Sequence, residues 1–242
     1  MGLFDRLNIP DTKEILPVMK DSHNLKSKLN TILDSGKLYA KNRDFAKAKE
    51  QFDFAFDVVD QMTENPDSYT ETIILSSRSL VFSRLSLMYF LQGDYAASLD
   101  ADFRDLELLI QLEPIYRRLH PDQEIINVQN LIMTYTCIAD CYNNIGDHEN
   151  ALKYANEAIS RCKEEMYTWG LSALTTSYYY SYLSMTRICC DLGSTQKALT
   201  YCREYLTICE LIPDYPDTKK GEIHYMKMKA ICNQIAETGA YK

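Results

Sequence analysis

Apolar and small residues recur at intervals of three and four along residues 131–162, which is the pattern of two amphipathic helices in succession. Ile138 and Tyr142 belong to the apolar stripe of the first helix. Gly146 is expected to end this helix, because glycine readily adopts the left-handed conformation of helix C-termini, and Asp147 is expected to cap the next. The second helix carries small residues at spacings of four and three: Ala151, Ala155 and Ala158. Small side chains on one face predict that the two helices pack closely.

The same order of residues occurs in three other segments. The first contains Gly36, Tyr39, Phe45, Ala48, Phe52 and Ala55; the second, Ser86, Tyr89, Gly93, Tyr95 and Ser98; the third, Thr186, Cys189, Gly193, Ala198, Cys202 and Tyr205. The expected turns between paired helices are Arg43-Asp44, Gly93-Asp94, Gly146-Asp147 and Gly193-Ser194. These roughly even intervals predict four copies of one helical hairpin.

The hairpin at residues 131–162 resembles a tetratricopeptide repeat, whose pattern is an aromatic residue, Leu-Gly and Tyr, followed across a turn by Ala and an aromatic residue. The resemblance implies an all-α fold, a right-handed solenoid of about four helical hairpins plus a terminal helix. The turns are further apart than the family's usual period of about 34 residues. We therefore expect a long-period variant with longer helices or longer connections.

The predicted organisation is a single repeat domain over residues 1–242. Its parts are a leader or N-terminal helix at 1–24, repeats at 25–66, 67–114, 121–166 and 168–213, and a C-terminal helix at 217–242. Ser68 and Glu71 form an expected capping box, and Asp122 is the expected cap of the helix that follows it. Apart from Pro10 and Pro17, the prolines coincide with the predicted boundaries.

The C-terminal helix allows two interpretations. It is either the first half of a fifth repeat in a longer protein or a cap over the last apolar face. Either arrangement is compatible with self-association through this helix.

Composition narrows the functional classes. The chain is 46% hydrophobic and 25% charged, as in ordinary folded proteins, and its net charge of −8 disfavours binding to nucleic acid. No apolar run approaches the roughly 20 residues that span a bilayer, and the N-terminus lacks the features of a signal peptide. We expect a cytoplasmic protein with no membrane span.

The sequence offers little for catalysis or metal binding. The eight cysteines lie mostly at apolar helix positions: Cys137, Cys141, Cys162, Cys189, Cys190, Cys202, Cys209 and Cys232. Cys137 and Cys141 share a helix face, but no second close pair or nearby histidine completes a zinc site. Buried thiols in a reducing compartment are the simpler interpretation; a metal or redox protein would need thiol pairs in contact. Asp100, Asp102 and Asp105 are expected on a solvated face. We therefore expect no enzyme, metal or cofactor.

In the resembled family the first helix of each pair lines a concave groove. Projection of the helical period places eight candidate residues in that groove: Arg84, Leu87, Phe90, Thr136, Asp140, Asn143, Tyr180 and Arg187. The alternative for several lining residues, Leu80, Met133 and Leu183 above all, is packing between repeats. Of the tyrosine cluster formed by Tyr178, Tyr179, Tyr180 and Tyr182, at most two can face a ligand, because the four spread round the helix. The residues that capture chaperone C-termini in one subfamily are not present as a set.

The favoured function is a non-catalytic scaffold or adaptor that binds a peptide or helix of a partner protein in the concave groove. The alternative is a sensory or regulatory region of a longer signalling or transcription-regulating protein. Long-period repeats occur in both kinds of protein, so this comparison is an analogy of fold.

Overall fold

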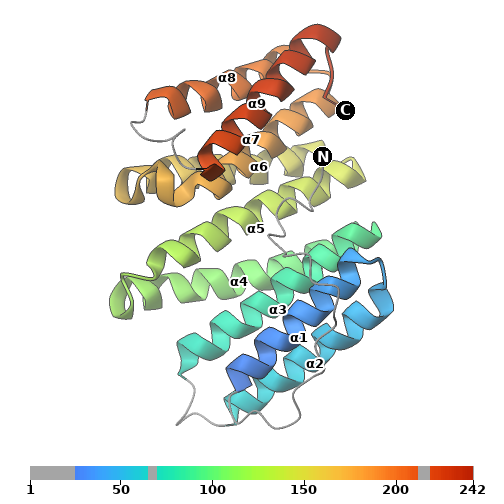
Figure 1. Ribbon diagram of the computed structural model, residues 1–242, viewed down its shortest axis with the longest axis vertical. Coiled ribbons are helices and arrows are strands. Elements are labelled where there is room, and N and C mark those ends of the chain that lie inside the picture. Colours follow the sequence, from blue (N-terminus) through green and yellow to red (C-terminus); the bar gives the residue numbers. More distant parts are fainter. Residues whose placement is uncertain (1–24, 65–69, 212–218, 242) are drawn as a thin grey trace. The chain divides into compact units, whose positions relative to one another are not determined.

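The computed structural model describes residues 25–64, 70–211 and 219–241, and within these ranges all regular elements are α-helices. They are α1 (Leu25–Lys41), α2 (Phe45–Thr63), α3 (Glu71–Gln92), α4 (Tyr95–Leu119), α5 (Glu124–Ile145), α6 (His148–Trp169), α7 (Leu171–Asp191), α8 (Thr195–Leu211) and α9 (Lys219–Thr238) (Figure 1). The expected leader at 1–24, the Ser68 cap and the boundary prolines Pro66, Pro213 and Pro216 lie outside the described residues.

The chain divides into two units after Leu108. In the first unit, α1 packs against α2 and α3, and α2 packs against α3. In the second, α5 packs against α6 and α7, α7 against α8 and α9, with further contacts between α6 and α7 and between α8 and α9. In both units the first helix of a hairpin therefore contacts both helices of the hairpin before it. This packing confirms an all-α helical-repeat solenoid.

Four hairpin turns in the described residues share one backbone geometry. A residue with positive φ ends the first helix, with φ of 62° at Arg43, 87° at Gly93, 83° at Gly146 and 67° at Gly193. The next residue donates its backbone N–H to a carbonyl five positions earlier, as in a Schellman motif: Asp44 to Tyr39, Asp94 to Tyr89, Asp147 to Tyr142 and Ser194 to Cys189. The Asp147 side chain accepts a hydrogen bond from the Asn150 N–H, so the expected cap is confirmed.

The contact between paired helices is filled differently in each hairpin. Ala151, Ala155 and Ala158 are fully buried, as the small-residue face predicted. In the first hairpin the Gly36 backbone lies against the ring of Phe52. In the second, the Ser86 and Ser98 hydroxyls are 3.1 Å apart. Small or mutually bonded side chains thus allow close helix packing throughout.

The expected end of α4 is wrong. Pro114 lies inside α4, which continues to Leu119 rather than stopping at a repeat boundary. Charged side chains on both sides of Pro114 pair with other parts of the second unit: Glu113 pairs with Arg161, and Arg117 Nε lies 3.0 Å from Glu124 Oε1. These ion pairs offset the hydrogen bond that proline removes from the helix.

The expected helix caps also need correction. The residue that precedes α5 is Gln123, which makes no capping hydrogen bond through its side chain, so Asp122 is not the cap. At the start of α3 the cap is Thr70, whose hydroxyl accepts from the Ile73 N–H at 3.4 Å. Helix ends in this chain are therefore set partly by tertiary contacts rather than by local capping signals.

Helix α3 is long and rich in apolar residues. By length and composition alone, Glu71–Gln92 is sufficient to cross a membrane. Its polar side chains nevertheless bond to neighbouring helices: Arg78 pairs with Asp60 of α2 at 2.6 Å, and Ser79 donates to Asp105 of α4. These contacts are those of a helix packed in a bundle.

Candidate partner-binding surface

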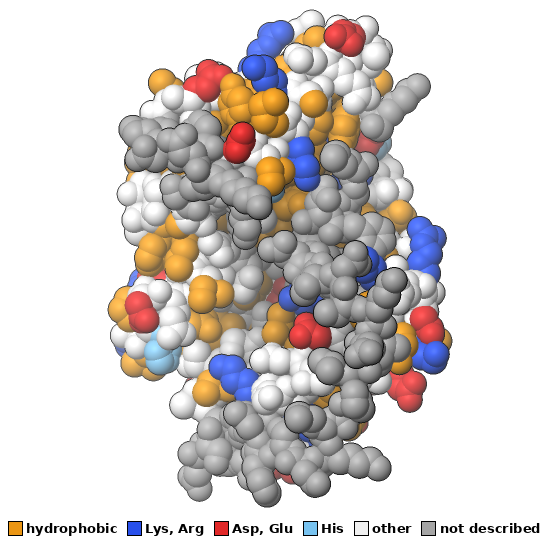
Figure 2. All heavy atoms as spheres, viewed as in Figure 1, with side chains coloured by type: hydrophobic (Ala, Val, Ile, Leu, Met, Phe, Trp, Pro, Cys, Tyr) orange, Lys and Arg blue, Asp and Glu red, His pale blue; other side chains and the backbone are white. Residues whose placement is uncertain are grey.

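The three candidates on α3 lie on one half-exposed side of that helix. Arg84, Leu87 and Phe90 are each neither fully buried nor fully exposed. The Phe90 ring meets Tyr95 edge-on, with ring centroids 5.3 Å apart, which fixes its orientation beside the hairpin turn. Figure 2 shows apolar and charged side chains interspersed on one face of the molecule. The α3 candidates thus combine a cation with apolar contact area.

A second cation lies close to Arg84 in the first unit. Lys37 of α1 is half-buried, and its pKa is lowered by burial and by the positive charge of Arg84. The pKa of Arg84 is also lowered by burial, while the carboxylates of Asp34 and Asp105 partly oppose that effect. Within the described residues neither cation has an ion-pair partner within 4 Å. The two side chains form a half-buried cationic pair on successive first helices.

The exposure of two aspartates on α4 was predicted wrongly. Asp102 and Asp105 of α4 are buried, each with 2% exposure, rather than on a solvated face. The Ser79 hydroxyl donates to Asp105 Oδ1 at 2.5 Å, which holds this carboxylate between α3 and α4. Asp100 follows the prediction, since its side chain is 75% exposed. One aspartate of the run therefore takes part in the electrostatics around Arg84.

Two of the α5 candidates are not on a free surface. Thr136 and Asp140 are buried against α7, where Thr136 Oγ1 lies 3.2 Å from Ser181 Oγ and the Ser184 hydroxyl donates to Asp140 Oδ1 at 2.6 Å. Asn143 is half-buried and donates to Asp191 at 2.5 Å. The assignment of Thr136 and Asp140 to a ligand groove is wrong, because they are buried in polar contacts between successive first helices, whereas the assignment of Asn143 stays a prediction.

The two candidates on α7 differ in exposure. Tyr180 is buried, and its ring packs edge-on against Tyr179 and His224. All four clustered tyrosines, Tyr178, Tyr179, Tyr180 and Tyr182, are buried, which agrees with the expected upper limit of two, but the placement of Tyr180 in a ligand groove is wrong. Arg187 stays half-buried and remains available. The surface that survives from the predicted set is centred on Arg84, Leu87 and Phe90.

A sequence-family model matches the segment that forms part of α5 and most of α6. Residues 134–165, which cover most of α5, the turn at Gly146 and α6 as far as Glu165, match the family model described as tetratricopeptide repeat. This match assigns the third hairpin to the tetratricopeptide-repeat family. No curated protein sequence matches it. The matched segment is the third of the four hairpins, and the other three share its turn geometry.

Lys37 is not among the eight groove residues that the sequence predicted. The eight projected residues all come from the second, third and fourth hairpins, although Gly36 and Ser86 occupy equivalent positions at the hairpin contacts. The same offset makes Lys37 the counterpart of Leu87. Extension of the pattern to the first hairpin would therefore have found this residue. Its proximity to Arg84, in contrast, depends on how α1 packs against α3.

The described residues contain no group of three or more His, Cys, Asp or Glu side chains placed to hold a metal ion. All eight cysteines are free thiols. The tetratricopeptide-type fold is typically non-enzymatic, and its repeats generally mediate protein–protein interaction.

Proposed function

We propose that this tetratricopeptide-repeat protein is a non-catalytic scaffold that binds an acidic segment of another protein on the first helices of its N-terminal hairpins. The observation that carries the proposal is the half-buried pair of Lys37 and Arg84. Arg84, Leu87 and Phe90 supply the α3 side of the surface, and Lys37 supplies the α1 side.

Keeping Lys37 and Arg84 charged while they are half-buried costs free energy. Burial lowers the pKa of both Lys37 and Arg84, and the charge of Arg84 lowers that of Lys37 further. Asp34 opposes the effect on both groups, and Asp105 opposes it on Arg84. A carboxylate ligand placed near both groups would relieve the repulsion and accept charge-assisted hydrogen bonds. Because the guanidinium of Arg84 presents a planar fork of donors, it suits a bidentate contact with a carboxylate.

Apolar contacts complete the proposed surface. Leu87 and Phe90 lie on the same half-exposed side of α3 as Arg84, so an apolar side chain beside the acidic residue would pack there. The net charge of −8 repels acidic segments from the rest of the surface, which favours this local cationic position over others.

We also propose that the protein works in a reducing compartment such as the cytoplasm. The eight free thiols support this location, since oxidising compartments favour disulfides.

Selection of displayed 12-residue peptides against the full chain tests the binding proposal. We expect the enriched peptides to contain Asp or Glu next to a large apolar residue. Arg84→Met and Lys37→Met should each weaken their binding about tenfold or more, because a charge-assisted hydrogen bond contributes about 1.5–3 kcal/mol. Methionine retains much of the apolar stem of either side chain, and circular dichroism verifies that both variants fold.

The matched control is Arg104→Met, which removes a cation whose side chain is 61% exposed on α4. Binding by this variant should equal that of the parent. Selection of peptides without acidic residues, or equal binding by the Arg84→Met and Arg104→Met variants, would contradict the proposal.

A further inference from the structure

Two cysteines of the second unit lie across from each other where α8 packs against α9. Cys202 is fully buried on α8, and Cys232 is half-buried on α9. Cys202 belongs to the buried apolar cluster of this unit, and Cys232 packs against that cluster. Hydrogen bonds from Thr195 to the Gly239 carbonyl and from Tyr225 to Glu210 set an antiparallel register of α8 and α9 in which residue 232 lies across from residue 202. Cys202 Sγ also lies 3.6 Å from Thr186 Oγ1 of α7, which holds it at the junction of three helices. The sequence placed these cysteines at separate apolar positions, and the tertiary structure brings them together.

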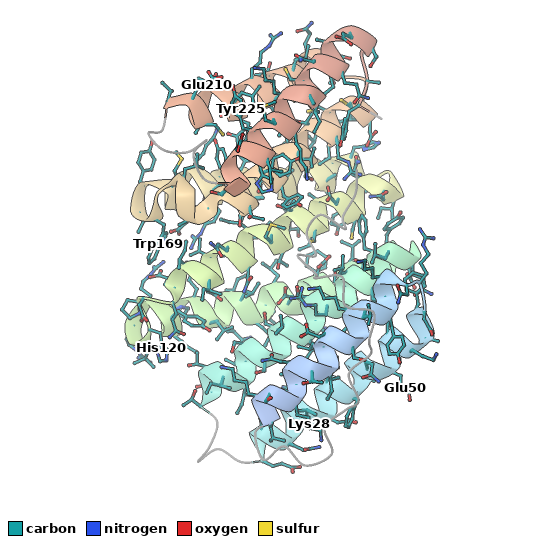
Figure 3. The ribbon with its side chains drawn as sticks, in the orientation of Figure 1. Lys28, Glu50, His120, Trp169, Glu210 and Tyr225 are labelled. Atoms are coloured by element: carbon teal, nitrogen blue, oxygen red, sulfur yellow. The ribbon has the colours of Figure 1, made fainter. Side chains whose placement is uncertain are left out.

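The surrounding contacts hold α8 and α9 in register. Met228 and Ile235 of α9 are fully buried in the same apolar cluster that contains Cys202. The Tyr225 hydroxyl donates to Glu210 Oε1 at 2.5 Å, joining α9 to the C-terminal end of α8 (Figure 3). Because apolar packing and this hydrogen bond fix the helix pair on either side of the thiols, the sulfur atoms stay near each other.

We propose that Cys202 and Cys232 form a reversible disulfide when the protein meets hydrogen peroxide, so that α9 becomes covalently tied to α8. In the first step the Cys232 thiol attacks the peroxide, its sulfur is oxidised to a sulfenic acid, and water leaves. In the second step the Cys202 sulfur attacks the sulfenic sulfur, the S–S bond forms, and a second water leaves. A dithiol reductant reverses the change through thiol–disulfide exchange.

The two thiols have different roles because their surroundings differ. Burial raises the pKa of Cys202 to about 12, so this thiol reacts poorly with dissolved oxidants. Cys232 is the more exposed partner, and it meets peroxide first. The position of Cys202 across the helix pair then favours the intramolecular step over further oxidation of the sulfenic acid.

The disulfide would change how firmly the last helix is held. In the reduced protein, α9 is joined to α7 and α8 by non-covalent contacts. A Cys202–Cys232 bond closes a loop of about 30 residues, which restricts the unfolded chain. The melting temperature of the oxidised protein should therefore exceed that of the reduced protein by roughly 5–15 °C. The bond would act as a redox-controlled latch on the end of the helical array.

Peptide mapping identifies the bond directly. After treatment of the full chain with hydrogen peroxide, alkylation of remaining thiols and non-reducing digestion with trypsin, Cys202 lies in the peptide 198–203 and Cys232 in the peptide 230–242. Each peptide contains one cysteine. We expect mass spectrometry to detect these two peptides linked, and dithiothreitol to separate them.

Cys232→Ser provides the matched variant, because a change at the half-buried position disturbs packing less than one at the fully buried Cys202. We expect no linked peptide and no peroxide-dependent rise in melting temperature for this variant. Cys137→Ser, at another half-buried thiol, should behave like the parent. Linkage of Cys202 to the peptide 188–197, which contains Cys190, would overturn the proposal. Conversion of Cys232 to a sulfinic acid without a linked peptide would overturn it as well.

Discussion

Arg43 occupies a backbone conformation that the equivalent turns assign to glycine. Its φ is 62°, whereas Gly93, Gly146 and Gly193 take the same left-handed region at the other hairpin turns. The Cβ atom makes this region unfavourable for most L-residues, and the surrounding Schellman hydrogen bonds hold Arg43 there. The repeat therefore imposes one turn geometry even where the residue does not favour it.

Arg43→Gly should raise the free energy of unfolding by about 0.5–1 kcal/mol, because glycine removes the strain of the left-handed conformation. Thermal and urea unfolding followed by circular dichroism measure the change. Gly146→Ala is the reciprocal control and should lower stability by about 1 kcal/mol. Equal stability of the parent and Arg43→Gly would mean that the turn carries no strain.

Gly36→Ala should lower stability by about 1–3 kcal/mol, although alanine ordinarily favours a helix over glycine. An added Cβ would lie 2.6 Å from Cε1 of the buried Phe52 ring, and that ring has no room to move. Chemical denaturation of Gly36→Ala, Phe52→Leu and the double variant measures the coupling. The double variant should be more stable than the sum of the single changes predicts, and strict additivity would contradict the contact.

At the scale of elements, pattern and tertiary contact determine different things. The paired helices of a hairpin follow from spacing: α5 and α6 end and begin at Gly146 and Asp147, as predicted. The end of α4 does not follow from spacing, because Glu113 reaches Arg161 of α6 and the helix passes through Pro114. An ion pair between residues far apart in sequence has no local signal.

Ala151→Arg should disrupt the α5–α6 hairpin and lower the free energy of unfolding by several kcal/mol, because it places a long cation at a fully buried small-residue position. Asn156→Arg, at an exposed position of the same helix, is the control for charge and helix propensity. Calorimetry of both variants gives the comparison. If Ala151→Arg melts like Asn156→Arg, the assigned register of α6 is incorrect.

At the scale of the whole molecule, the buried tyrosines should limit stability at alkaline pH. Burial raises the pKa of Tyr178 and Tyr182 well above the usual value near 10, and the Tyr182 hydroxyl donates to Glu204. Because both phenols ionise more easily in the unfolded chain, their contribution to stability is complete below about pH 10 and is lost as pH rises toward their raised pKa values.

We expect a melting temperature that falls above about pH 10, with each buried tyrosine contributing up to about 1.4 kcal/mol per pH unit to the decline. Thermal melts at a series of pH values measure it. Tyr182→Phe should show a shallower decline, while Tyr167→Phe, at a side chain that is 89% exposed, should follow the parent. Identical slopes for both variants would contradict a role for the buried phenol.

The sequence by itself determined the helical hairpins, their turns and the small-residue contacts within each pair, because these depend on spacing along one helix and on the backbone freedom of glycine. Only the tertiary structure decided which sides of the first helices are covered. Thr136, Asp140 and Tyr180 are polar or amphipathic, so their pattern indicated a surface, yet partners on other helices satisfy and bury them. Lys37 and Arg84 are 47 positions apart, and Cys202 and Cys232 are 30 apart (84 − 37 and 232 − 202). Their proximity arises from packing between helices, which the periodicity of a single helix does not encode.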